Sequence, residues 1–258
     1  PRTPKWCDNP RSPANWTEQS ASRSWRDVLT TAHISKHNDL LLLDYDGVVA
    51  DSLTAIREHT AAFCRERGLG QGLASAAIAC MRSATLAGLI EAAGITGEHV
   101  REYGRYLFRE LNKNPSRVPL FDGIPELLRD LATSYTLCIV SANHSAVVRQ
   151  RLESAGLVDL MAHLYGNEQP GGKAEHIRQA MASHGGSAES TWMIGDTVGD
   201  IRAAKQAGVH AVAVTWGWQS LETLERAGPN LIFEQPEVMH RYFSGQPGAV
   251  SATHPDAT

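Results

Sequence analysis

The sequence predicts an α/β fold, in which a doubly wound, mostly parallel Rossmann-like sheet carries an α-helical segment inserted after its first strand. Short apolar runs alternate with helical patterns along most of the chain, which is typical of a sheet built from β–α units. The runs are apolar almost throughout, as in strands that are covered on both faces. Residues 53–117 instead contain helical patterns without a convincing strand, and they predict the insertion.

Six strands and four helices of the sheet region follow from these patterns in chain order. The strand candidates are residues 39–44, 135–141, 162–165, 191–196, 211–215 and 231–233. The helix candidates between them are residues 123–133, 144–155, 172–184 and 199–207. Gly156 and Gly208 follow two of these helices, and a glycine in that position is a common helix stop.

The inserted segment contains helical patterns over residues 53–67, 72–93 and 97–112. Because it follows the first strand directly, we expect it to form a cap that opens and closes over one end of the sheet. The expected organisation is an N-terminal arm at 1–37, a Rossmann-like core at 38–52 and 118–243, an α-helical cap at 53–117 and a disordered tail at 244–258.

The composition argues against several classes of function. The 258 residues carry a formal net charge of −4, so the chain lacks the basic footprint that nucleic acid or an anionic membrane requires. No apolar run approaches the roughly 20 residues of a membrane span. The four cysteines form neither a CxxC pair nor a zinc spacing, which favours a reduced, cytoplasmic protein. We therefore expect neither a nucleic-acid nor a membrane partner, and the oligomeric state is open.

Two acids at the end of the first strand are the most informative feature. Four leucines run into Asp44, Asp46 follows two residues later, and Gly47 comes next. Burying unpaired carboxylates is costly, so a pair in this position indicates a metal, a cation or a shared proton.

Three further polar features lie where other strands end. Ser141 ends the run "IVS", Lys173 opens a helix behind two glycines, and Asp196 and Asp200 stand in "GDTVGD". Open α/β sheets bind their ligands at the carboxyl ends of the strands, so these side chains are expected around one crevice. Carboxylates suit Mg²⁺, whereas a hydroxyl and an ammonium suit a phosphate group.

The four features resemble, in order, the motifs of the haloacid dehalogenase superfamily. "DYDGV" at 44–48 matches its DxDx[TV] motif, Ser141 and Lys173 match the second and third motifs, and "GDTVGD" at 195–200 matches GDxxxD. The insertion resembles the small helical cap of the subclass that includes phosphoglycolate phosphatases and β-phosphoglucomutase. The resemblance spans roughly residues 38–240.

This resemblance implies how the acids divide the chemistry. Asp44 would be the nucleophile that forms an aspartyl-phosphate, and Asp46 would be the general acid and base. Asp44, Asp196 and the backbone carbonyl of Asp46 would bind Mg²⁺. Asp200 would orient the lysine or reach the metal through water, and Gly47 would support the loop of the two acids.

The resemblance also implies a phosphate site. Ser141 and Lys173 would hold the phosphoryl oxygens. The backbone amides around Ala142 are expected to donate to the same group, and Asn143 either contacts phosphate or simply ends the loop. Two weaker substrate candidates are Arg82 in the cap, whose alternative is an exposed helix arginine, and Trp216 in "TWGWQS", whose alternative is packing against the sheet.

Each motif has a plain structural explanation when it is taken alone. "DYDG" is compatible with a turn, Ser141 and Asp200 with helix N-caps, and Lys173 with a solvated surface lysine. Their occurrence together and in order favours chemistry.

The function expected from these residues is Mg²⁺-dependent hydrolysis of a small-molecule phosphate monoester. The family's dehalogenases lack the acid at the position of Asp46, so this residue favours phosphate chemistry. The alternatives are a phosphomutase of the β-phosphoglucomutase type and an inactive family member that serves as a binding protein.

Overall fold

A six-stranded parallel sheet forms the centre of the computed structural model, which describes residues 39–70, 72–74, 77–78, 81, 85–113 and 118–245. Its strand order is β3-β2-β1-β4-β5-β6, and every neighbouring pair is parallel. The strands are β1 (Leu40–Leu43), β2 (Thr136–Val140), β3 (Met161–Tyr165), β4 (Thr191–Gly195), β5 (His210–Val214) and β6 (Leu231–Phe233). Each predicted strand is present to within one residue at both ends, and the predicted fold class is confirmed.

The four predicted helices of the sheet region are also present. They are α6 (Ile124–Leu131), α7 (Ser145–Ser154), α8 (Lys173–His184) and α9 (Val198–Ala207). The structure adds two helices and a 3₁₀ turn that the sequence analysis did not single out: α10 (Leu221–Ala227), α11 (Pro236–Phe243) and η2 (Val158–Leu160). Both additional helices have ordinary start signals, namely Ser220 as the N-cap of α10 and a proline in the first turn of α11.

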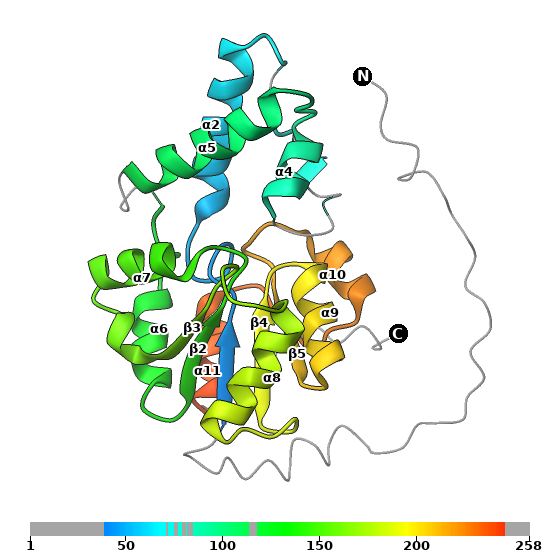
Figure 1. The fold of residues 1–258 in the computed structure, drawn as a ribbon. Coiled ribbons are helices and arrows are strands. Elements are labelled where there is room, and N and C mark those ends of the chain that lie inside the picture. Colours follow the sequence, from blue (N-terminus) through cyan, green and yellow to red (C-terminus); the bar gives the residue numbers. More distant parts are fainter. Residues whose placement is uncertain are drawn as a thin grey trace, which may run out of the picture. The chain divides into compact units, whose positions relative to one another are not determined.

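The leucines of β1 are buried on both faces of the sheet, because successive side chains of a strand point to opposite sides. Leu41 and Leu43 belong to one apolar cluster with residues of α6 and α11, whereas Leu40 and Leu42 belong to another with residues of α8 and α9. Figure 1 shows these helices on the two sides of the sheet. A continuous apolar run is therefore what this central position requires.

The inserted helices have an apolar cluster of their own. They are α2 (Ser52–Glu66), α4 (Leu86–Ala92) and α5 (His99–Lys113), and Figure 1 shows them at the end to which the strands point. Phe63 and Cys64 of α2 pack with Tyr103 and Leu107 of α5 in this cluster. Tyr103 and Leu107 are four residues apart and therefore lie on one face of α5.

The helical pattern over 72–93, within a segment predicted to hold three or four helical stretches, is not one continuous helix. Ala77 and Ile78 are helical, and α4 begins only after Thr85, whose side chain accepts a hydrogen bond from Gly88 N at 3.2 Å. A threonine that caps a helix in this way ends the possibility of continuing it backwards. Arg82 lies outside the described residues.

Two adjacent backbone segments join the insertion to the sheet. Asp51 N donates to Pro119 O at 2.8 Å, and Phe121 N donates to Val49 O at 3.1 Å. The insertion therefore leaves and re-enters the sheet region at one place. Its predicted role as a separate cap domain stays a prediction. The predicted arm at 1–37 and the tail beyond residue 245 lie outside the described residues.

In the part of the chain that the structure describes, none of the helices combines the length and the apolarity that crossing a membrane requires.

We expect Leu42→Ala to destabilise the fold by about 2–5 kcal/mol, because Leu42 is fully buried at the centre of the sheet and its truncation leaves a cavity. Urea unfolding followed by circular dichroism measures the change. The matched control is Leu86→Ala, at a side chain that is 46% exposed, and its cost is expected to stay within about 0.5 kcal/mol. Equal costs for the two variants would contradict this account of the core.

Candidate active site

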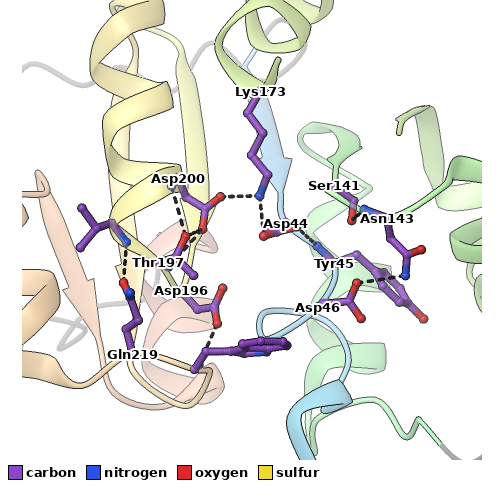
Figure 2. A network of polar contacts seen from close by, with 12 residues as sticks. Asp44, Tyr45, Asp46, Ser141, Asn143, Lys173, Asp196, Thr197, Asp200 and Gln219 are labelled. Atoms are coloured by element: carbon purple, nitrogen blue, oxygen red, sulfur yellow. Dashed lines mark hydrogen bonds and ion pairs between the residues drawn. The ribbon is translucent and has the colours of Figure 1, made fainter. Parts of the chain in front are cut away.

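The predicted polar residues come together at the carboxyl ends of three adjacent strands. Asp44 follows β1, Ser141 follows β2 and Asp196 follows β4, while Lys173 is the first residue of α8. Figure 2 shows these side chains around one site. Because β1 lies between β2 and β4, parallel pairing brings their ends to the same edge of the sheet.

Lys173 is an ion-pair partner of two acids rather than a surface lysine. Its Nζ lies 2.5 Å from Asp44 Oδ2 and also donates to Asp200 Oδ1. Burial alone would lower the pKa of Lys173, but the carboxylates of Asp200 and Asp44 outweigh it and raise that pKa above its ordinary value. The ammonium group is therefore firmly held in its charged form.

Three carboxylates share a buried space beside this lysine. Asp44, Asp196 and Asp200 are 4%, 0% and 2% exposed, and one oxygen of each lies within 4.8 Å of the others. Burial is the main cause that raises the pKa of Asp44 to about 7, against the opposing effect of Lys173. Burial, Asp200 and Asp44 together raise the pKa of Asp196 well above its usual range. One ammonium group does not balance this charge, so the cluster can accept a further cation.

Asp196 offers a ligand atom for such a cation. Its Oδ2 accepts a hydrogen bond from Trp218 N at 2.8 Å, whereas its Oδ1 is buried and has no hydrogen-bond partner among the described residues. A buried carboxylate oxygen is normally paired, so this atom is available as a ligand.

Asp200 also stabilises the start of α9. Its Oδ2 accepts hydrogen bonds from Thr197 Oγ1 at 2.6 Å and from Thr197 N at 3.1 Å, which completes a capping box with Thr197 as the N-cap. Asp200 is therefore not itself the N-cap, and its second oxygen is the one that contacts Lys173.

Two glycines allow the backbone to approach Asp196. Gly47 has a φ of 90°, and a Cβ atom there would collide with the Asp196 carboxylate. A Cβ atom at Gly217 would collide with the same carboxylate and with the carbonyl oxygen of Gly47. Only glycine fits at both positions, so the two loops form a tight cradle around Asp196.

Asp46 points away from the three clustered carboxylates. Its Oδ2 accepts a hydrogen bond from Asn143 Nδ2 at 3.2 Å, and its Oδ1 lies 3.6 Å from Arg151 Nη1. Its side chain is 19% exposed. The carboxylate therefore lies beside the cluster and remains reachable from the adjacent cavity.

The loop after β2 is held in a defined conformation. Ser141 Oγ accepts a hydrogen bond from Asn143 N at 3.0 Å, and Ala142 O accepts one from Asn167 Nδ2 at 2.9 Å. The N-cap of α7 is His144, whose Nδ1 accepts from Ala146 N. Ser141 is therefore not the helix cap that its position alone would allow.

A cavity of about 190 Å³ opens beside Asp44 and Asp46. Residues of the sheet region and of the inserted helices line it together: Asp44, Asp46, Ile56, Thr85, Leu86, Leu89, Gly104, Leu107, Phe108, Leu111, Asn112, Ser141, Ala142, Asn143, Arg151, Asn167 and Trp218. Small-molecule sites combine such apolar walls with a few polar groups, so this cavity is the candidate substrate site.

The sequence analysis missed Arg151, Trp218 and Gln219. Arg151 lies on the buried side of α7, and its Nη2 donates to Leu111 O of α5 at 3.4 Å. The sequence did contain a signal for Arg151: it is a charged residue on the otherwise apolar face of α7 that includes Leu152. Trp218 belongs to the apolar cluster of the insertion, and Gln219 Nε2 donates to Met81 O. These loop contacts had no local sequence signal.

Trp216 is placed differently from its neighbour. Its Nε1 donates to Val48 O at 3.1 Å and its ring packs against the core cluster, as the alternative explanation expected. It does not line the cavity, whereas Trp218 does.

Residues 41–214 match the family described as haloacid dehalogenase-like hydrolase. The chain belongs to this family, as the four motifs predicted, and it is an enzyme of its phosphatase group.

Three similar proteins match the chain over most of their own length. A phosphoglycolate phosphatase from Synechococcus elongatus is 26% identical over 76% of this chain and 92% of its own length. The protein named "Probable phosphatase IndB" from Dickeya dadantii is 30% identical over 76% and 89%. The solved structure of a haloacid dehalogenase-like hydrolase from Streptococcus pneumoniae has a TM-score of 0.70 at 23% identity, with 80% and 98% covered. The similarity to this solved structure confirms the fold.

We expect Asp46→Asn to destabilise the protein by about 1–3 kcal/mol, because it leaves the guanidinium of Arg151, only 4% exposed, without its carboxylate partner. In the background of Arg151→Met the same change should cost less than about 0.5 kcal/mol. Urea unfolding of the four proteins of this double-mutant cycle measures the coupling. Additive effects would show that the pair does not interact.

Proposed function

We propose that the chain is a Mg²⁺-dependent phosphatase that hydrolyses small-molecule phosphate monoesters through an aspartyl-phosphate on Asp44. The observation that carries the proposal is the position of Asp44, which lies at the end of β1 between a lysine and two further acids and opens onto the cavity. A nucleophilic carboxylate needs nearby positive charge to accept a phosphate dianion, and this site can supply it.

The residues present fit Mg²⁺, a hard cation that prefers oxygen ligands. Asp44 and Asp196 would hold the ion with the carbonyl of Asp46, and Asp200 would support it through water. The unpartnered Asp196 Oδ1 and the glycine cradle around this carboxylate agree with a ligand at this point. Once bound, the ion would supply positive charge to the phosphoryl oxygens.

Asp44 would attack the phosphorus atom, so that its carboxylate oxygen bonds to phosphorus while the ester bond to the leaving alcohol breaks. Asp46 would donate its proton to the leaving oxygen. The same residue would then take a proton from water, whose oxygen attacks phosphorus, breaks the bond to Asp44 and releases inorganic phosphate. The carboxylate of Asp46 lines the cavity, as both proton transfers require.

The phosphoryl oxygens would be held by groups on both sides of Asp44. Lys173 would neutralise charge from one side, and the Ser141 hydroxyl with the amides near Ala142 and Asn143 would donate hydrogen bonds from the other. For the compartment we propose the cytoplasm, in agreement with Cys64 and Cys138, which are buried free thiols.

We expect Asp44→Asn to abolish turnover without unfolding the protein, because the amide keeps the shape of the side chain but is not a nucleophile. Phosphate release from a panel of phosphomonoesters, with Mg²⁺ and with EDTA, measures the effect, and thermal unfolding checks the fold. Wild-type activity in the variant would sink the covalent mechanism. Isomerised product without free phosphate would favour a phosphomutase.

We expect Mg²⁺ to raise the melting temperature more at pH 8 than at pH 5. The pKa of Asp44 rises from 3.8 to about 7 on folding, so the metal-free fold binds more protons than the unfolded chain between these values and loses stability as pH rises. Mg²⁺ binds the deprotonated acids, so its stabilisation grows over the same range. Thermal unfolding with MgCl₂ or EDTA measures this.

The matched control for this measurement is Asp196→Asn, which is expected to lose most of the Mg²⁺ effect at pH 8. A shift that is unchanged in this variant would place the ion elsewhere.

A further inference from the structure

We infer that the alcohol part of the substrate is an uncharged, apolar group that binds in the 190 Å³ cavity beneath α4 and α5. This inference rests on the proposed phosphatase function and specifies its substrate class. Several relatives are named phosphoglycolate phosphatase, and phosphoglycolate carries a carboxylate on the alcohol side. The inferred substrate class of this chain is therefore different.

The wall that the insertion contributes to the cavity is mostly apolar. Besides the buried Leu89 and Leu107, it includes Leu86 and Phe108, which are 46% and 58% exposed. Large apolar side chains with this exposure are uncommon among the described residues, and neither belongs to an apolar cluster of the fold. Such side chains at a cavity mark a surface that an apolar ligand can cover.

The lining of the cavity as a whole has no accessible positive charge among the described residues. Arg151 is the sole arginine or lysine that lines the cavity in the described part of the chain, and its Nε and Nη1 are buried without hydrogen bonds. Its guanidinium faces Asp46 and the carbonyl oxygen of Leu111. Among the described residues that line the cavity, the other charged side chains are those of Asp44 and Asp46. A carboxylate on the alcohol would therefore lose water and meet two acids.

A second cavity, of about 630 Å³, has charged side chains of both signs in its lining, including the acids Asp44, Glu175 and Asp200. It lies on the other side of the site, along α8 and α9, and is lined by Lys173, Arg178 and Arg202. Both cavities reach Asp44, but Asp46 lines only the apolar one. Because Asp46 is the proposed proton donor to the leaving oxygen, the alcohol must lie on the apolar side.

The test compares shape-matched substrates. Isobutyl phosphate replaces the carboxylate of phosphoglycolate by an isopropyl group of similar size. We expect its kcat/KM to exceed that of phosphoglycolate by about tenfold or more, because the carboxylate loses hydration without a partner. Along the series from methyl to butyl phosphate, kcat/KM should rise about threefold to fourfold per methylene group until the cavity is filled.

Phe108→Arg tests the wall directly. Because Phe108 is exposed, the change should leave the melting temperature nearly unaltered, while it supplies a cation and lowers the ratio of isobutyl phosphate to phosphoglycolate by about tenfold. The matched control is Arg109→Ala on the next residue of α5, which does not line the cavity and should leave the ratio unchanged.

The outcomes separate this inference from the function on which it rests. Phosphate release that is equal or faster with phosphoglycolate, or a flat alkyl series, would overturn the inference and leave the phosphatase in place. No Mg²⁺-dependent release from any ester, including para-nitrophenyl phosphate, would overturn the phosphatase itself. Calorimetric titration at fixed free Mg²⁺ measures binding without turnover, with phosphonoacetate and isobutylphosphonate as the non-hydrolysable analogues. Tighter binding of phosphonoacetate would also overturn the inference of an apolar substrate.

Discussion

The crowding of three buried carboxylates around one lysine is the constraint on which the rest of this site depends. Asp44, Asp196 and Asp200 come from two strand ends and a helix start, and the sheet holds them too close together to be charged without compensation. Lys173 supplies one positive charge. The remaining imbalance explains both why a metal ion suits the cluster and why a phosphate group could be drawn to it once an ion is bound. A chain that merely bound a partner protein would have no evident reason to bear this electrostatic cost.

Close backbone packing makes the crowding possible. Gly47 and Gly217 leave room for the carboxylate of Asp196, which no other residue type would do. The loop that contains Gly217 continues into Trp218, whose amide holds Asp196 and whose ring packs in the apolar cluster of the insertion. Gln219 then joins the start of α9 to the backbone of Met81. The carboxylate cluster and the inserted helices are thus connected through Gly217, Trp218 and Gln219.

The site divides into a polar floor and an apolar wall. The sheet supplies the floor, which in the proposed mechanism acts on the phosphoryl group that every substrate shares. The insertion supplies the wall, which in the proposed binding mode contacts the alcohol part of the substrate. Arg151 links the two, because it reaches both Asp46 and the carbonyl oxygen of Leu111.

The sequence by itself determined the sheet and the residues at its edge. The central strands were visible because a strand covered on both faces is apolar throughout, whereas the edge strand β3 exposes Ala162 and His163. The acids and Lys173 were visible because polar residues follow the apolar runs where the strands end. Tertiary structure decided the rest. Arg151, Trp218 and Gln219 act through partners far along the chain, and the helical pattern over 72–93 is interrupted at Thr85. The apolar character of the cavity also emerged only when Leu86 and Phe108 were placed opposite Asp46. Local patterns report burial and backbone preference, whereas these features depend on which distant segments meet.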